Sequence, residues 1–510
     1  MSGTIDTALL LGAAVLLVAV VAVRLSTRAG LPSLLVYLAL GVAIGESGLG
    51  IQFENAELTR NLGFVALFVI IAEGGLTTRW SVVRPVVAAA ATLATFGVFV
   101  SVAAVGVAVH LLLHLPWEVA LLYGAVLSST DAAAVFSTLR RLRLRPRLTA
   151  MLEAESGIND APAVLLVVAL STFIAADHPG VWWQQALLIA YELAAGAVIG
   201  LAVGVVGAIG LRRFALPAAG LYPLAAFGLT VLAYASGAVA HASGFLAVYV
   251  AGVVLGNARI PHRQAVLGFA DGLAWLAQIG LFVLLGLLAS PARLPSAVLP
   301  ALLVGAVLVL LARPISVAAS VSWFRVGWRE QAFLSWAGLR GAVPIVLATV
   351  PLSMALPVAE KLFDVVFVLV VVFTVAQAST IAPVARLLGV TAPGEPTELR
   401  VETAPLDRMQ ADLLELDIPP GSHLAGVYID ELRLPAGAVV TLVLRGGVGF
   451  VPDARTRLRA GDGLLIVATA ECRDAAERRL RAVSRRGRLA RWRGEGGGSD
   501  RSAGRSDGAV

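Results

Sequence analysis

Apolar segments long enough to cross a bilayer occupy most of the first 388 residues of this chain. A transmembrane helix needs about 20 mainly apolar residues, and thirteen segments meet that need. They lie near residues 6–24, 32–49, 61–78, 84–113, 118–139, 148–174, 183–211, 219–236, 239–257, 264–289, 296–322, 330–355 and 361–388. Only 14% of the 510 residues are charged, whereas soluble domains carry about 25%. The sequence therefore predicts an all-α polytopic membrane protein.

Arginine-rich loops follow every second apolar segment. The arginines concerned are Arg24, Arg28, Arg79, Arg84, Arg140, Arg141, Arg212, Arg213, Arg259, Arg263, Arg325 and Arg329. Basic residues concentrate in the cytoplasmic loops of membrane proteins. We therefore expect a cell-membrane protein with its N-terminus outside and its C-terminus in the cytoplasm. The net charge of +6 is explained by this topology rather than by nucleic-acid binding.

The composition changes after the transmembrane domain, which is predicted to cover residues 1–390. Residues 391–402 contain Pro and Gly and predict a linker. Within 403–483, short alternating runs separated by glycine turns, and one helix from about 470, predict a small cytoplasmic α+β domain. Residues 484–510 are rich in Arg, Gly and Ser and are predicted to be disordered.

Four charged residues are predicted near the middle of four different spans. At about 1.5 Å per helical residue, Asp160 lies ~18 Å from the inner start of the sixth span. Asp131 lies ~20 Å from the outer face and Arg340 ~15 Å from the inner face, and Glu73 is close to the middle of the third span. Charged residues inside a membrane usually mark an ion path or a proton relay. Their shared depth predicts a single site.

One face of the sixth span combines acids with neutral oxygen donors. At about 100° per residue, an arc of roughly 140° holds Glu155, Ser156, Asn159 and Asp160. Such hard oxygen donors suit alkali cations and suit soft metals poorly. Arg340 needs a carboxylate partner at this depth, and we assign Glu155 to it. Asp160 is then available to exchange a proton for a cation.

Helix breakers are predicted in the fifth and twelfth spans. Two glycines and a proline lie within 338–344, and residues 128–131 can hydrogen bond locally in competition with the helix. Transporters line their midplane sites with discontinuous helices. We expect these spans to be the two discontinuous crossing helices of inverted repeats, with Asp131 compensating the exposed N-terminus of a half-helix. Arg313, in the eleventh span, has no assigned partner.

Three motifs lie on these spans in a characteristic order. They are Ser129-Thr130-Asp131-Ala132-Ala133-Ala134-Val135-Phe136, Glu155-Ser156-Gly157-Ile158-Asn159-Asp160 and Gly338-Leu339-Arg340-Gly341-Ala342-Val343-Pro344. Together they resemble the monovalent cation/proton antiporter family of the NhaP type. Residues 403–483 are similar to the C-terminal subdomain of RCK (TrkA-C) regulators of potassium transport. This pairing looks most like the bacterial potassium/proton antiporter branch.

The resemblance implies a transporter, not an enzyme, that works as a homodimer by alternating access. Asp160 would bind the cation or the proton in turn. Ser156, Glu73 and the backbone around Thr130 would complete the ion shell. The transported cation would thus lie at Asp160, Ser156 and Thr130, and no resident cofactor is implied.

The resemblance also implies a set of organising residues. Asn159 and Asp131 would organise the helix crossing, and Glu155 would pair with Arg340. Electrogenic relatives carry Asp where this chain has Asn159, so electroneutral one-for-one exchange is implied. Members that prefer sodium often carry Pro where this chain has Ala132. Ala132 does not decide the cation; K⁺ is favoured because the pairing with the TrkA-C-like segment looks most like the potassium branch, and Na⁺/H⁺ exchange by the same fold is the alternative.

Functions of other classes leave different sequence signatures. The chain contains no H-E-x-x-H or G-x-S-x-G motif for a membrane protease and no T-V-G-Y-G-like filter for a K⁺ channel. A ligand-gated cation channel remains the alternative from another class, because RCK-type domains also regulate channels. Residues 403–483 lack a G-x-G-x-x-G fingerprint. We hypothesise that they bind a small regulatory nucleotide, such as a cyclic dinucleotide.

Overall fold

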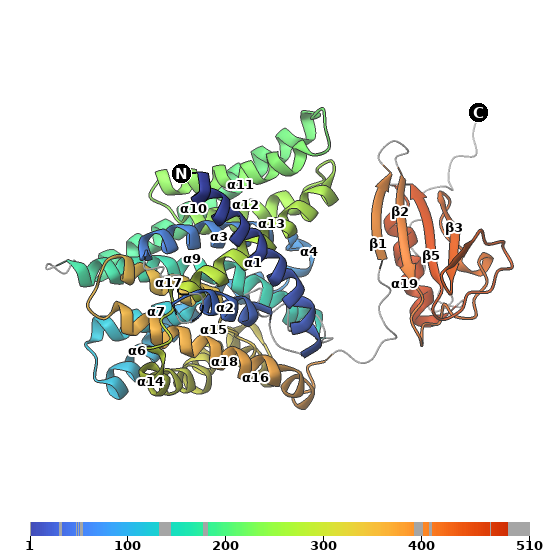
Figure 1. The fold of residues 1–510 in the computed structure, drawn as a ribbon. Coiled ribbons are helices and arrows are strands. Elements are labelled where there is room, and N and C mark those ends of the chain that lie inside the picture. Colours follow the sequence, from blue (N-terminus) through green and yellow to red (C-terminus); the bar gives the residue numbers. More distant parts are fainter. Residues whose placement is uncertain are drawn as a thin grey trace, which may run out of the picture. The chain divides into compact units, whose positions relative to one another are not determined.

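The chain folds into two compact units, Met1–Thr391 and Ala392–Val510. The computed structural model describes residues 2–29, 33–46, 48, 50, 55–131, 144–176, 182–391, 401–406, 411–469 and 471–487. Figure 1 shows that the first unit is helical and that the second contains a β-sheet. Each unit has a hydrophobic core of its own.

Apolar helices make up the first unit. They are α1 (Ser2–Ala29), α2 (Ser33–Ile44), α3 (Ala56–Thr77), α4 (Trp80–Val83), α5 (Val87–Ala94), α6 (Phe96–Leu113), α7 (Trp117–Ser128), α9 (Pro146–Ala175), α10 (Trp182–Arg213), α11 (Leu221–Val239), α12 (Gly244–Asn257), α13 (Arg263–Leu288), α14 (Leu294–Val307), α15 (Arg313–Val321), α16 (Trp328–Trp336), α17 (Ala342–Ser353) and α18 (Ala359–Leu387). Among the described residues, eight helices are long and apolar enough to cross a membrane, and five shorter apolar helices accompany them. Each predicted span overlaps one of these helices, and the count of thirteen crossings stays a prediction.

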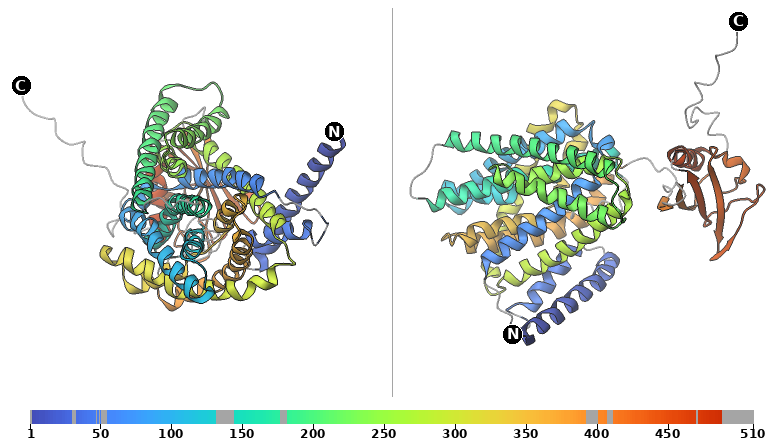
Figure 2. Two further views of the ribbon diagram at one scale, coloured as in Figure 1. Left: turned by 90° about the vertical axis from the view of Figure 1, so that its left-hand side faces the viewer. Right: turned by 90° about the horizontal axis from the view of Figure 1, so that it is seen from above.

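The helices of the first unit pack in two groups, which we name the panel and the core. In the panel, α12 packs against α3, α10 and α11, and α13 packs against α2 and α3. In the core, α9 packs against α5, α7 and α17, and α18 packs against α14 and α17. Figure 2 shows these helices from two further directions. The panel and the core meet where α3 packs against α17 and where α12 packs against α9.

Glycines allow close helix contact within the panel. A Cβ added at Gly200 of α10 would lie 2.3 Å from the carbonyl oxygen of Ala247 on α12, and one at Gly196 would lie 2.5 Å from that of Ser243. Small residues let helix backbones approach this closely in membrane proteins. The contact packs α10 and α12 closely into one layer.

The twelfth predicted span is discontinuous, as expected. Helix α16 ends at Trp336 and α17 begins at Ala342, and the residues between them are not helical. The fifth span stops being helical at Ser128, and residues 129–131 follow without helical structure. Residues 132–139, the rest of that predicted span, lie outside the described residues. The two helix breaks lie side by side, because the Asp131 backbone N–H donates to the Leu339 carbonyl at 3.0 Å.

A π-helical turn, Leu308–Ala312, lies between α14 and α15. The Arg313 backbone N–H donates to the Leu308 carbonyl. The next residue is Pro314, which has no N–H and whose ring crowds the preceding turn of a regular α-helix. The wider turn accommodates it and rotates Arg313 relative to a regular helix.

The second unit is a small α+β domain, as predicted. Its strands are β1 (Val401–Leu406), β2 (Ala411–Asp417), β3 (Ala438–Arg445), β4 (Val448–Phe450) and β5 (Gly463–Thr469), in the antiparallel order β1-β2-β5-β3-β4. Helix α19 (Arg473–Arg486) packs on β5. It includes residues 484–486, the first three residues of the segment predicted to be disordered. Residues 488–510 lie outside the described residues.

Candidate functional site

Helix α9 places four polar side chains in the interior of the first unit. Glu155, Ser156, Asn159 and Asp160 are each at most 5% exposed. The helix begins with Pro146, whose missing N–H costs nothing in the first turn. The polar face predicted from helix periodicity is therefore buried in the core, where α9 packs against α7 and α17.

Hydroxyl groups from the break after α7 contact the polar face of α9. The Ser129 hydroxyl donates to Asp160 Oδ1 at 2.5 Å. Thr130 Oγ1 lies 3.1 Å from Ser156 Oγ, and Asn159 Nδ2 donates to Thr130 Oγ1 at 2.6 Å. The three residues predicted to hold the cation, Asp160, Ser156 and Thr130, are thus brought into one buried cluster. Its carboxylate and hydroxyl oxygens are the donors that alkali cations prefer.

Ser129 is a site residue that sequence reasoning missed. Its side chain is fully buried and touches the carboxylate directly. The sequence reasoning used Ser129 only as a helix-breaking residue. Ser129 directly precedes Thr130 and Asp131, two residues that were predicted to belong to the site. This position could have indicated Ser129 as well, because an extended segment can also direct its side chain toward α9.

Asp131 lies at the N-terminus of the half-helix α17. The Ala342 backbone N–H donates to Asp131 Oδ2 at 3.0 Å, and Asp131 is 5% exposed. A carboxylate at this position satisfies an unpaired N–H and interacts favourably with the helix dipole. Gly341 has no room for a side chain, since an added Cβ would overlap Asp131. This is the geometry expected for Asp131.

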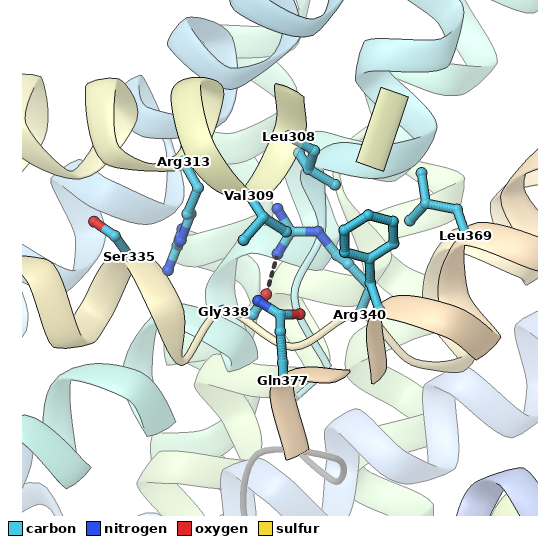
Figure 3. Close-up of a pocket in the computed structure, with 9 residues that line it drawn as sticks. Leu308, Val309, Arg313, Ser335, Gly338, Arg340, Leu369 and Gln377 are labelled. Atoms are coloured by element: carbon cyan, nitrogen blue, oxygen red, sulfur yellow. Dashed lines mark hydrogen bonds between the residues drawn. The ribbon is translucent and has the colours of Figure 1, made fainter. Parts of the chain in front are cut away.

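Arg340 lies at the opposite, carbonyl ends of the broken helices. Its Nε donates to the Leu127 carbonyl at 2.8 Å and its Nη1 to the Gly338 carbonyl at 3.0 Å. Figure 3 shows the second of these bonds. Leu127 is in the last turn of α7, and Gly338 follows the end of α16. A cation is stabilising at such carbonyl ends.

The predicted ion pair between Glu155 and Arg340 is wrong. Glu155 instead pairs with Arg313, whose Nη1 and Nη2 donate to Oε1 and Oε2 at 2.5 and 2.8 Å. Depth alone could not choose between two arginines at a similar level. The π-helical turn before Arg313 alters the direction of its side chain, and no helix periodicity predicts that. Figure 3 shows Arg313 and Arg340 near Gly338.

The Glu155–Arg313 pair is closed off from solvent. The side chains are 2% and 6% exposed, and the two parallel bonds match the planar guanidinium to the carboxylate. A Cβ at Gly338 would lie 2.6 Å from Arg313 Nε, so this glycine makes room for the pair.

Glu73 lies on a helix of the panel, whereas the other predicted ligands of the cation lie in the core. It belongs to α3, a panel helix, and lies four residues before α3 ends at Thr77. It is half-buried, whereas Asp160, Ser156 and Thr130 are buried in the core. Its place in the ion shell stays a prediction.

Comparisons with known families agree with both units. Residues 14–387 match the family described as sodium/hydrogen exchanger, transmembrane, and residues 413–481 match the TrkA-C domain. The K(+)/H(+) antiporter NhaP of Alkalimonas amylolytica is 37% identical over 458 residues, which are 88% of this chain and 79% of the relative. The K(+)/H(+) antiporter NhaP2 of Shewanella oneidensis is 35% identical over 480 residues, which are 92% of this chain and 83% of the relative.

A solved structure shares the fold of the first unit. The sodium proton antiporter MjNhaP1 from Methanocaldococcus jannaschii superimposes with a TM-score of 0.65 at 23% sequence identity, covering 76% of this chain and 99% of that one. The family match over residues 14–387 and the 37% identical relative place the chain among multi-pass membrane transporters. The chain belongs to the sodium/hydrogen exchanger family.

Proposed function

We propose that this chain is a secondary active antiporter that exchanges a monovalent cation, preferentially K⁺, for H⁺ across the cell membrane. The observation that carries the proposal is Asp160, a buried carboxylate that accepts a hydrogen bond from the Ser129 hydroxyl at the break after α7. Two relatives that align with about nine-tenths of the chain are named K(+)/H(+) antiporters, which supports K⁺. Na⁺/H⁺ exchange by the same site is the alternative.

The chemistry of the exchange follows from a single carboxylate. A protonated Asp160 has no charge to hold a cation, and a bound cation favours the ionised form. Proton and cation therefore compete for the same oxygen atoms. The hydroxyls of Ser156 and Thr130, and that of Ser129, would replace part of the water around the dehydrated ion.

The four buried charges around Asp160 balance one another. Glu155 is neutralised by Arg313. Asp131 and Arg340 lie at helix ends of opposite polarity and carry opposite charges. Asp160 would then be the group whose charge changes, so the loaded site is neutral with either a proton or a monovalent cation. This supports electroneutral one-for-one exchange, with Asn159 as a neutral neighbour.

Topology and assembly extend the proposal. The arginine-rich loops support an N-terminus outside and a C-terminus in the cytoplasm. Helix α10 exposes large apolar side chains along its length, including Leu187, Val198, Leu201 and Val206. Such a surface fits membrane lipid together with a second copy of the chain, so we include a homodimer in the proposal. The TrkA-C domain would regulate transport by binding a small ligand such as a cyclic dinucleotide.

Proteoliposomes containing the purified chain provide the test. An outward K⁺ gradient should drive proton uptake, Na⁺ should compete less well than K⁺ across pH, and the rate should not change when a membrane potential is imposed. Absence of cation-driven proton movement would contradict antiport. A cation current without coupled protons would instead support a ligand-gated channel.

A further inference from the structure

Gly157, on the polar half of α9, is in contact with an aromatic ring from the panel. A Cβ added at Gly157 would lie 2.2 Å from Cε2 and 2.6 Å from Cζ of Tyr249, on α12. Tyr249 is 5% exposed. A buried ring so close to a helix backbone leaves no room for a side chain, so this contact depends on glycine.

The Tyr249 ring lies over the segment of α9 between Glu153 and Asp160. Residues Glu153 and Asp160 are two turns apart, and at about 100° per residue their directions differ by only about 20°. Gly157 lies between them and about 60° from Asp160. Tyr249 is near enough to Glu153 for electrostatic interaction. The ring therefore covers the route along this face from Glu153 to the ion site.

Polar groups gather on the Glu153 side of the ring. Thr78, the residue after α3, lies near the Tyr249 hydroxyl. Arg79 is near Glu153, and Asn257 Nδ2 donates to the Thr78 carbonyl at 2.8 Å. In the proposed topology this side faces the cytoplasm. The Tyr249 hydroxyl thus lies among polar groups at the cytoplasmic end of the path, and the Tyr249 ring lies between these groups and Asp160.

The contact joins the two bodies that alternating access must separate. Gly157 belongs to the core, and Tyr249 belongs to the panel. Another contact between the same bodies is the hydrogen bond from Arg60 Nη1 on α3 to Ser353 Oγ on α17, at 2.9 Å. In the proposed topology that bond lies on the outer side of the ion site. Movement of the core against the panel would open one side while the other stays closed.

We infer that Tyr249 is the cytoplasmic gate of the ion path and that Gly157 is the surface on which it closes. This rests on the proposed function and identifies the residue that controls access from the cytoplasm. Cations or protons reach Asp160 from that side only when the ring leaves Gly157. Glu153 is the carboxylate at the mouth of the opened path.

Cysteine labelling tests the gate without relying on transport. The sequence has one cysteine, Cys472, so Cys472→Ser provides a background for a reporter at Ser129→Cys, the residue in contact with Asp160. A membrane-impermeant thiol reagent is applied from the cytoplasmic side of inverted vesicles. A minor open state usually has a population of about 0.1–10%, so Tyr249→Ala should speed labelling by at least about tenfold. Tyr249→Phe, which keeps the ring, should label slowly.

Two further variants complete the test. Gly157→Ala should also speed labelling, because its Cβ and the ring cannot both keep their positions, and adding Tyr249→Ala to it should give no further increase. Tyr234→Ala, on α11 among Phe68 and Phe245, is the matched control and should label slowly. Unchanged labelling in both Tyr249→Ala and Gly157→Ala would overturn the gate. Loss of exchange in the unmodified protein would count against the proposed function alone.

Discussion

Glu155 and Asp160 are two buried carboxylates little more than one turn apart on the same helix, and their partners differ. Glu155 receives two hydrogen bonds from the Arg313 guanidinium. Asp160 receives a hydrogen bond from the Ser129 hydroxyl. A guanidinium fixes the charge of its partner, whereas a hydroxyl can remain in place when a proton or a cation arrives. The partner, rather than burial, decides which carboxylate can exchange ions.

Removing Arg313 should have the largest effect on stability. Arg313→Ala leaves Glu155 as a buried charge without its counter-ion, which costs about 3–5 kcal/mol. We expect loss of the monodisperse, folded protein in detergent, measured by size-exclusion chromatography and thermal unfolding. Arg340→Ala is the matched control: it removes bonds to neutral carbonyls and leaves no hydrogen-bonded carboxylate without its guanidinium, so we expect a smaller loss of stability. An Arg313→Ala protein as stable as the unmodified one would break the comparison.

Asp131 tests a carboxylate whose partner is a helix end. Asp131→Asn keeps an oxygen to accept the Ala342 N–H but loses the charge, so we expect destabilisation of about 0.3–2 kcal/mol. Thermal unfolding in detergent measures it, with Asp131→Ala expected to be less stable than Asp131→Asn. Equal stability of the two variants would mean that the hydrogen bond to α17 contributes nothing.

Substitution of Ser129 tests whether its hydroxyl helps Asp160 to bind the cation. Ser129→Ala removes one hydrogen bond to a charged group, and a contribution of about 1–2 kcal/mol corresponds to roughly 5- to 30-fold weaker apparent cation affinity. Ser129→Thr, which retains the hydroxyl, should recover most of it. The half-saturating K⁺ concentration for exchange is the measurement. An unchanged value in Ser129→Ala would show that the hydroxyl does not take part in ion binding.

The cytoplasmic unit contains a carboxylate–guanidinium pair, Asp462 with Arg445, in which the arginine is partly exposed to water. Burial alone would raise the pKa of Asp462, but the Arg445 guanidinium and the Arg459 backbone N–H hold that pKa below its ordinary value. A carboxyl group with a lowered pKa in the folded state stabilises the domain above the unfolded pKa, and this contribution is lost as pH falls through the folded value.

The pH dependence of domain stability tests this pair. We expect the denaturation midpoint of a 401–487 fragment to fall below about pH 4, and the Asp462→Asn fragment to lose less stability over that range. Arg445 is 31% exposed, against 6% for Arg313, so the effect should be smaller than that of Arg313→Ala. A midpoint with the same acid dependence in both fragments would argue against a stabilising role for Asp462.

Much of the fold could be predicted because it depends on composition and periodicity. Segment length located the apolar helices, the glycines around Gly338 located the break before α17, and helix phase placed Ser156 beside Asp160. Asp131 at the start of α17 followed from the same break. Each of these features depends on residues close together in the sequence, so a single segment is enough to predict it.

The partners of the buried charges could not be predicted in the same way. Glu155 pairs with Arg313 because a π-helical turn changes the rotation of α15, and regular periodicity does not include that change. Ser129 reaches Asp160 through an extended segment whose path depends on α17. Depth along a helix gives the level of a side chain but not its direction, and direction decides which charges meet.

Substitution of Asp160 tests the central claim most directly. Asp160→Asn keeps the size of the side chain but replaces the carboxyl group with an amide. The amide cannot release a proton, so it provides no negative charge for a cation. The account predicts that this variant folds and elutes like the unmodified protein, yet shows no K⁺- or Na⁺-driven proton exchange in proteoliposomes at any pH. Exchange that survives in Asp160→Asn would contradict the claim that Asp160 binds cation and proton in turn.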